Sequence, residues 1–168
     1  GGRGSFRILS STVSTAVKEA AARDAGATHV IRYTDEDFAA ATLRLTGGDK
    51  VHVVYDSVGK TTFDRGLDCL APRGTMVLFG QSSGAVAPLE LQTLNAKGSL
   101  FVTRPNLDHH VATRSELVAR AADVLGWVAA GELVVRIDRA LPLAEAATAH
   151  RLLESRATSG KLLLLPNG

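Results

Sequence analysis

The chain has 168 residues, a length that suits one domain. Its 19 basic and 17 acidic residues give a formal net charge of +2, which does not indicate a dedicated nucleic-acid binder. The 45% hydrophobic and 21% charged content is typical of a globular chain. Cys69 is the single cysteine, which excludes a disulfide framework and a thiolate zinc cluster. No apolar run approaches the roughly 20 residues of a membrane span, and the first residues lack the apolar core of a signal peptide. We therefore expect a cytoplasmic protein.

Short β-branched runs alternate with segments of helical periodicity. Several runs are apolar on consecutive positions, as in strands that are buried on both faces. The order strand, helix, strand predicts right-handed βαβ units, a parallel sheet and helices on both faces. The expected strands cover residues 7–12, 29–33, 51–57, 75–80, 99–104 and 161–165, with a further apolar run at 133–137; the expected helices cover 15–25, 35–45, 61–70, 113–130 and 143–155.

Several residues of the sequence are suited to begin or end the predicted helices. Gly26 is placed to be the C′ residue of the first helix. Thr34 is a candidate N-cap of the second, and Thr113 with Glu116 forms a capping-box pattern at the fourth.

Ligands of open parallel sheets bind beyond the carboxyl ends of the strands, so the residues after each strand are the candidate site. Ser14, Thr15 and Lys18 follow the first strand, where hydroxyls and a cation at a helix N-terminus favour an anion. The first acid in this segment is Glu19, so a 2′-phosphate would meet Lys18 without a preceding carboxylate. Taken alone, the segment is better explained by Ser14 or Thr15 as an ordinary N-cap and Lys18 as a solvated helix residue.

The second and third strands also end in candidate contacts. Tyr33 can stack on adenine or donate to a phosphate, or it can be a strand-end aromatic that is half in the core. Asp56 and Ser57 can face a ribose, with Gly59 allowing close backbone approach, or they can form a simple helix cap and turn.

The fourth and fifth strands lead into a glycine-flanked polar loop, FGQSSG at 79–84, and into Thr103-Arg104-Pro105. The loop at 79–84 suits backbone contact with a flat ring or amide. We favour a functional role for this loop over a plain connection. Arg104 is either a ligand contact or a solvated strand end. The five histidines do not match a zinc motif, and Ser82 and Ser83 do not form a nucleophile elbow.

Several longer runs together resemble one family. They are VVYDSVG at 53–59, LDCLAPRG at 67–74, FGQSSGAV at 79–86, KGSLFVTRP at 97–105 and AHRLLESRATSGKLLLLP at 149–166. The chain is similar to the bacterial NADPH:quinone oxidoreductases, the zinc-independent, ζ-crystallin-like branch of the medium-chain dehydrogenases and reductases. The resemblance covers about residues 7–166.

This resemblance implies a Rossmann-like three-layer α/β/α fold with a mostly parallel sheet, and NADPH as cofactor. The implied cofactor-binding positions are Ser14, Thr15, Lys18, Tyr33, Ser57, Phe79, Gly80, Gln81, Ser82, Thr103, Arg104, Pro105 and Arg156. The family usually has asparagine at the position of Gln81 and glycine at that of Ser14. We name no catalytic acid, base or metal ligand.

The resemblance also implies parts that are not found in this sequence. Family members begin with a GroES-like domain, and their cofactor domain begins with a strand and a glycine-rich turn of the AAGGVG type. We therefore expect residues 1–168 to form one partial NADPH-binding domain that lacks this strand, which is central in the order 3-2-1-4-5-6.

The expected function is NADPH-dependent reduction of a quinone or related enone, with this chain alone inactive. The resemblance further implies a homodimer through the edge strand at Ser99–Arg104, a small-molecule substrate, and no membrane or nucleic-acid partner. Two alternatives stay open: a non-catalytic nucleotide-binding or dimerisation module, and the cofactor domain of a zinc-type alcohol dehydrogenase.

Overall fold

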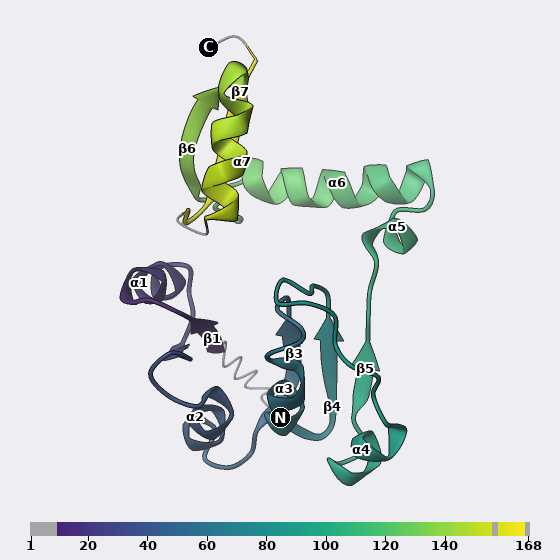
Figure 1. Ribbon diagram of the computed structural model, residues 1–168. Helices are drawn as coiled ribbons and strands as arrows, with labels where there is room; N and C mark the ends of the chain where they lie inside the picture. Colours follow the sequence, from purple (N-terminus) through teal and green to yellow (C-terminus); the bar gives the residue numbers. More distant parts are fainter. Residues whose placement is uncertain (1–9, 156–157, 167–168) are drawn as a thin grey trace. The chain divides into compact units, whose positions relative to one another are not determined.

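The computed structural model describes residues 10–155 and 158–166 (Figure 1). The chain divides into two compact units, Gly1–Asn106 and Leu107–Gly168, which are described separately. That the two units together form the single domain expected from the sequence remains a prediction. Within the described residues, no helix combines the length and the apolar character that crossing a membrane requires.

The first unit alternates strands and helices. Its elements are β1 (Ser10–Val13), α1 (Ala16–Asp24), β2 (His29–Arg32), α2 (Phe38–Leu45), β3 (Val51–Asp56), α3 (Phe63–Asp68), β4 (Leu70–Leu78), α4 (Leu91–Ala96) and β5 (Phe101–Thr103). The elements of the second unit are α5 (Leu107–His110), α6 (Arg114–Ala129), β6 (Ile137–Pro142), the 3-10 helix η1 (Leu143–Glu145), α7 (Ala146–Glu154) and β7 (Lys161–Leu165).

All strand pairs of the described chain are parallel, which confirms the α/β class. In the first unit β1 pairs with β2, and β3, β4 and β5 form a separate sheet in that order. The break lies between β1 and β3. In the order 3-2-1-4-5-6 this is the place of the first strand.

The core of the first unit lies between α3 and the sheet β3-β4-β5 (Figure 1). Leu67, Leu70 and Met76 are almost fully buried, and Phe63 and Leu100 complete the cluster. A side chain at Gly66 would lie 2.7 Å from the methyl carbon of Met76, so a glycine lets α3 approach β4 this closely. The core therefore fixes the carboxyl ends of β3 and β4 relative to each other.

Helix caps explain two boundaries that the sequence predicts and one that it places wrongly. Thr15 caps α1, and Thr113 with Glu116 forms the expected capping box of α6. Thr34 does not cap α2. Asp37 does, since one of its carboxylate oxygens accepts from the amides of Ala39 and Ala40, each at 2.9 Å.

Strand boundaries differ from expectation where the backbone turns. The expected strand at 99–104 is limited to β5, because Ser99 has a left-handed φ of 57°. β4 begins five residues earlier than expected, with an irregular register and a φ of 62° at Arg73. Of the apolar run at 133–137, Ile137 alone belongs to a strand, β6.

Candidate functional site

The ends of β1 and β2 are joined beyond the last paired residues. The amide nitrogen of Tyr33 donates to the carbonyl oxygen of Val13 at 3.1 Å, and the hydroxyl of Thr34 donates to the carbonyl of Ser14 at 3.3 Å. The Thr15 hydroxyl accepts from the amide of Lys18 at 3.3 Å. Ser14, Thr15 and Tyr33 therefore lie at one edge, where α1 begins.

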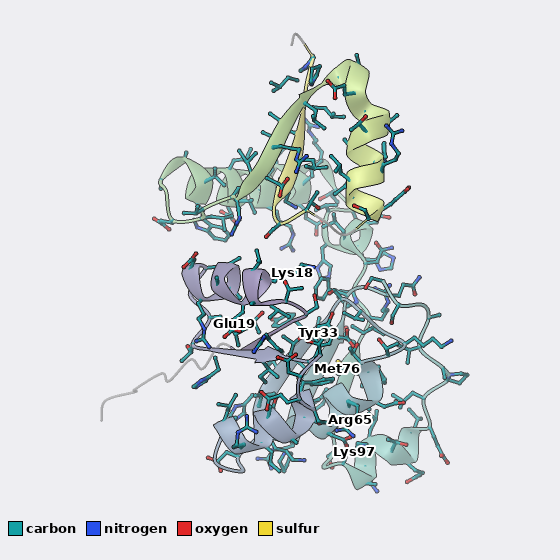
Figure 2. All side chains as sticks on the ribbon, turned by 60° about the vertical axis from the view of Figure 1, so that its left-hand side comes forward. Lys18, Glu19, Tyr33, Arg65, Met76 and Lys97 are labelled. Atoms are coloured by element: carbon teal, nitrogen blue, oxygen red, sulfur yellow. The ribbon has the colours of Figure 1, made fainter. Side chains whose placement is uncertain are left out.

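Two charged residues of α1 differ in their pairing. Lys18 is half-buried and makes no ion pair or side-chain hydrogen bond within the described residues (Figure 2). The neighbouring Glu19 pairs with Arg23 at 3.0 Å and with Arg32 at 3.3 Å. The cation nearest the start of α1 is thus left available, whereas the carboxylate beside it is held by two guanidinium groups.

Tyr33 is 52% exposed, so about half of its surface is accessible to a ligand. It has no hydrogen bond from its hydroxyl within the described part of the chain. An exposed aromatic face and a lysine in the first turn of α1, which makes no ion pair with the described residues, suit a flat, anionic ligand at this edge.

The turn after β3 is organised by Asp56, which is 6% exposed. Its carboxylate accepts from the amides of Val58 at 2.7 Å and Gly59 at 3.0 Å, and from the Thr62 hydroxyl at 2.9 Å. These donors occupy the carboxylate. They support the alternative that Asp56 caps the turn, and Ser57 is the exposed polar side chain at this position.

The turn after β3 and the loop after β4 are held together by their backbones. The amide of Gly80 donates to the carbonyl of Asp56 at 3.2 Å, and that of Ser82 donates to the carbonyl of Ser57 at the same distance. A Cβ atom on Gly80 would lie 2.8 Å from the Cα atom of Ser57, so this position requires glycine. Gly80 thus acts through packing of the two loops.

Three side chains point out of this double loop. Phe79 is 52% exposed, and Gln81 and Ser82 are also exposed. One strand further along, Thr103 at the end of β5 lies opposite Val77 of β4. Thr103 and Arg104 are exposed and Pro105 is half-buried.

The implied binding residues therefore fall into two groups. The adenosine-side group, Ser14, Thr15, Lys18 and Tyr33, lies at the ends of β1 and β2. The nicotinamide-side group, Ser57, Phe79, Gly80, Gln81, Ser82, Thr103, Arg104 and Pro105, lies at the ends of β3, β4 and β5. Arg156 lies outside the described residues.

Sequence reasoning missed two features of these groups. Arg32, which pairs with Glu19 and with Asp35, was not singled out, although a basic residue before Tyr33 was visible. The cap and turn at Asp56 was one of the two alternatives, but Thr62 was not named as a further donor to its carboxylate. Such pairings depend on the fold and have no local signal.

Comparison with known proteins gives the family. Residues 25–164 match the family described as "Zinc-binding dehydrogenase", and the chain belongs to it. The chain is 49% identical over 162 residues to quinone oxidoreductase 1 of Escherichia coli strain K12, and 43% identical over 156 residues to 2-haloacrylate reductase of a Burkholderia species. These matches cover 94% and 92% of the chain, but 49% and 47% of the relatives.

A solved structure supports the same similarity to the quinone oxidoreductases. The crystal structure of Escherichia coli quinone oxidoreductase complexed with NADPH matches 94% of the chain, with 49% identity and a TM-score of 0.87. The chain spans about half the length of that protein. The resemblance to the quinone oxidoreductases, and the Rossmann-like fold that it implies, are confirmed.

The family description raises the question of zinc. In the described segments, 10–155 and 158–166, no three histidine, cysteine, aspartate or glutamate side chains are grouped as metal ligands. Cys69 is buried at the end of α3, and this burial raises the pKa of its thiol, which disfavours the thiolate that zinc needs. The described residues therefore offer no set of side chains that fits a zinc ion.

Proposed function

We propose that this chain is the cofactor-binding portion of an NADPH-dependent quinone oxidoreductase, which reduces a quinone or a related enone. The observation that carries the proposal is Lys18 at the start of α1, which has no ion-pair partner among the described residues, together with the exposed ring of Tyr33 at the end of β2. The 49% identity to a quinone oxidoreductase, and the match to one complexed with NADPH, support it.

The adenosine half of the cofactor would lie at the ends of β1 and β2. Lys18 would pair with the 2′-phosphate, and the amides of the first turn of α1 favour the same negative charge. Ser14 and Thr15 offer hydroxyls at this edge, and Tyr33 offers a surface for the adenine ring. Arg156 is proposed as a further contact.

The nicotinamide half would lie against the double loop after β3 and β4. NADPH, when bound, supplies the hydride. Phe79 would shield the ring from water, and the Gln81 amide and the hydroxyls of Ser57 and Ser82 would orient it by hydrogen bonds. Gly80 holds the two loops at the required distance, and residues 103–105 line the adjacent strand end.

Lys18→Glu tests the 2′-phosphate site. The substitution reverses one charge next to the phosphate, so we expect NADPH affinity to fall at least about tenfold while NADH affinity changes by less than about twofold. Calorimetric titration with both cofactors measures the difference. Glu36→Lys, a charge reversal of equal size at an exposed ion pair with Arg44 in the same unit, is the control. Equal losses for the two cofactors would contradict the assigned role of Lys18.

A second role, as a dimerisation module, is favoured by the outer edge of the sheet. β5 is the last strand of its sheet, and Phe101 in it is 60% exposed. An apolar edge strand with free backbone groups pairs readily with a second copy. We propose a homodimer through Ser99–Arg104, a small-molecule substrate for the whole protein, and a location in the cytoplasm.

A further inference from the structure

The carboxylate of Glu19 has an unusual place for a site that favours a phosphate. It directly follows Lys18 in α1, and a free acid in this region usually binds the ribose 2′-hydroxyl of NADH. In the structure it is not free. Its side chain is 26% exposed, and its two oxygens face two different guanidinium groups, Arg23 at 3.0 Å and Arg32 at 3.3 Å.

Arg32 is the partner that lies on the ligand-binding edge. It is the last residue of β2 and directly precedes Tyr33. Its guanidinium group also pairs with Asp35 at 3.0 Å, in the turn after β2. Arg23 instead pairs with Glu19 from one helical turn further along α1, toward the end of the helix. The chain of charges Arg23, Glu19, Arg32 and Asp35 is neutral, so Lys18 adds the net positive charge at this edge.

We propose that Arg32 is a specificity-determining residue for NADPH over NADH, and that it acts as a positioning residue by holding the Glu19 carboxylate. This inference rests on the proposed NADPH function and deepens it. Holding Glu19 has two consequences: the 2′-phosphate meets Lys18 with little repulsion, and a ribose 2′-hydroxyl finds no free carboxylate to accept its hydrogen bond.

Arg32→Gln tests this role in the full chain. Adenosine 2′,5′-bisphosphate serves as the probe for the adenosine half of NADPH, and adenosine 5′-monophosphate for that of NADH, with binding followed by nuclear magnetic resonance at the amides of Lys18 and Tyr33. Arg23 contacts only the Oε1 oxygen of Glu19, and Arg32 contacts Oε2. We expect the affinity for the bisphosphate to fall about three- to tenfold, since Arg32→Gln leaves Oε2 without its guanidinium partner next to the phosphate. The affinity for the monophosphate should stay the same or rise.

Two further variants separate the mechanism from simple damage to the fold. Arg32→Lys keeps the charge and should restore most of the bisphosphate affinity. Arg32→Gln with Glu19→Gln removes the released carboxylate and should return the affinity to within about twofold of the wild type. Arg23→Gln is the matched control, and it should change the ratio of the two affinities by less than about twofold because Arg32 still holds the Oε2 oxygen of Glu19 on the ligand-binding edge.

Two results would overturn the proposal. The first is an equal loss of both probes in Arg32→Gln, which would indicate a structural role. The second is a double variant that remains as weak as Arg32→Gln, which would mean that Glu19 is not the group through which Arg32 acts. A wild-type chain that binds neither probe would instead defeat the proposed function, and the inference with it.

Discussion

At the scale of single residues, Asp56 decides the shape of the nicotinamide-side group. It is buried, and its carboxylate is the acceptor for two backbone amides and one hydroxyl in the turn that follows β3. The backbone of this turn then receives the amides of Gly80 and Ser82. A single buried side chain therefore organises the turn to which both loops are joined.

Asp56→Ala should lower the free energy of unfolding by about 2 to 3 kcal/mol, because it leaves three donors without an acceptor in a mostly buried turn. Urea denaturation measures the change. Asp64→Ala, which removes an exposed carboxylate from α3, is the control and should cost less than about 1 kcal/mol. A loss of the same size in both variants would contradict the organising role of Asp56.

Glu116 gives a prediction about pH. Hydrogen bonds from the backbone amide and the hydroxyl of Thr113 lower the pKa of Glu116 below its ordinary value of 4.5. A carboxyl group with a lowered pKa in the folded state stabilises the fold above its unfolded pKa, and this contribution is lost as the pH falls through the folded pKa. The cap of α6 should therefore persist at pH 4.5 and weaken below it.

The Thr113 amide reports this directly. Its nuclear magnetic resonance shift should titrate with a midpoint below pH 4.5 in the wild-type chain, and this transition should be absent in Glu116→Gln. A wild-type midpoint at or above 4.5 would show that the capping box does not stabilise the charged carboxylate.

At the scale of elements, β5 carries the proposed subunit contact. Phe101→Asp places a charge on the exposed edge of the sheet and should convert a dimer into a monomer, since a buried unpaired carboxylate at the interface is costly. Light scattering at several protein concentrations measures the change. Leu107→Asp is the control, because Leu107 lies outside the strand and is also well exposed, at 71% against 60% for Phe101. An unchanged dimer in Phe101→Asp would place the interface elsewhere.

The elements also show what the sequence could predict. Consecutive apolar residues predicted the parallel strands, and Thr113 with Glu116 predicted the start of α6, because each signal is contained in a few neighbouring residues. The cap of α2 was placed wrongly, since Thr34 and Asp37 are both suitable cap residues and only the fold shows that Thr34 instead contacts Ser14.

For the candidate site, the sequence predicted the positions of the residues but not the contacts between them. Its positions follow from the ends of the strands, so Ser14, Lys18 and Tyr33 could be named from the sequence as one edge. The ion pairs at this edge could not be predicted from the sequence. Arg32 and Glu19 are thirteen residues apart, and their contact exists because β1 and β2 pair in parallel and place α1 beside β2.

At the scale of the whole molecule, the separation of the two sheets of the first unit is the main feature. β1 and β3 each pair on one side, with β2 and β4, and each has a second edge that pairs with no strand of the described chain. The two groups of implied binding residues lie at the ends of these two sheets. A dinucleotide would have to contact both groups of residues. Binding of a dinucleotide therefore tests whether the ends of the two sheets form one site.

The most direct test of the account is calorimetric titration of the 168-residue chain with NADPH and, separately, with NADH. We expect saturable binding of NADPH that is at least about tenfold tighter than that of NADH, because Lys18 makes no ion pair with the described residues and Glu19 is held by Arg23 and Arg32. Binding of neither cofactor, or equal binding of both, would contradict the claim that these strand ends form an NADPH site.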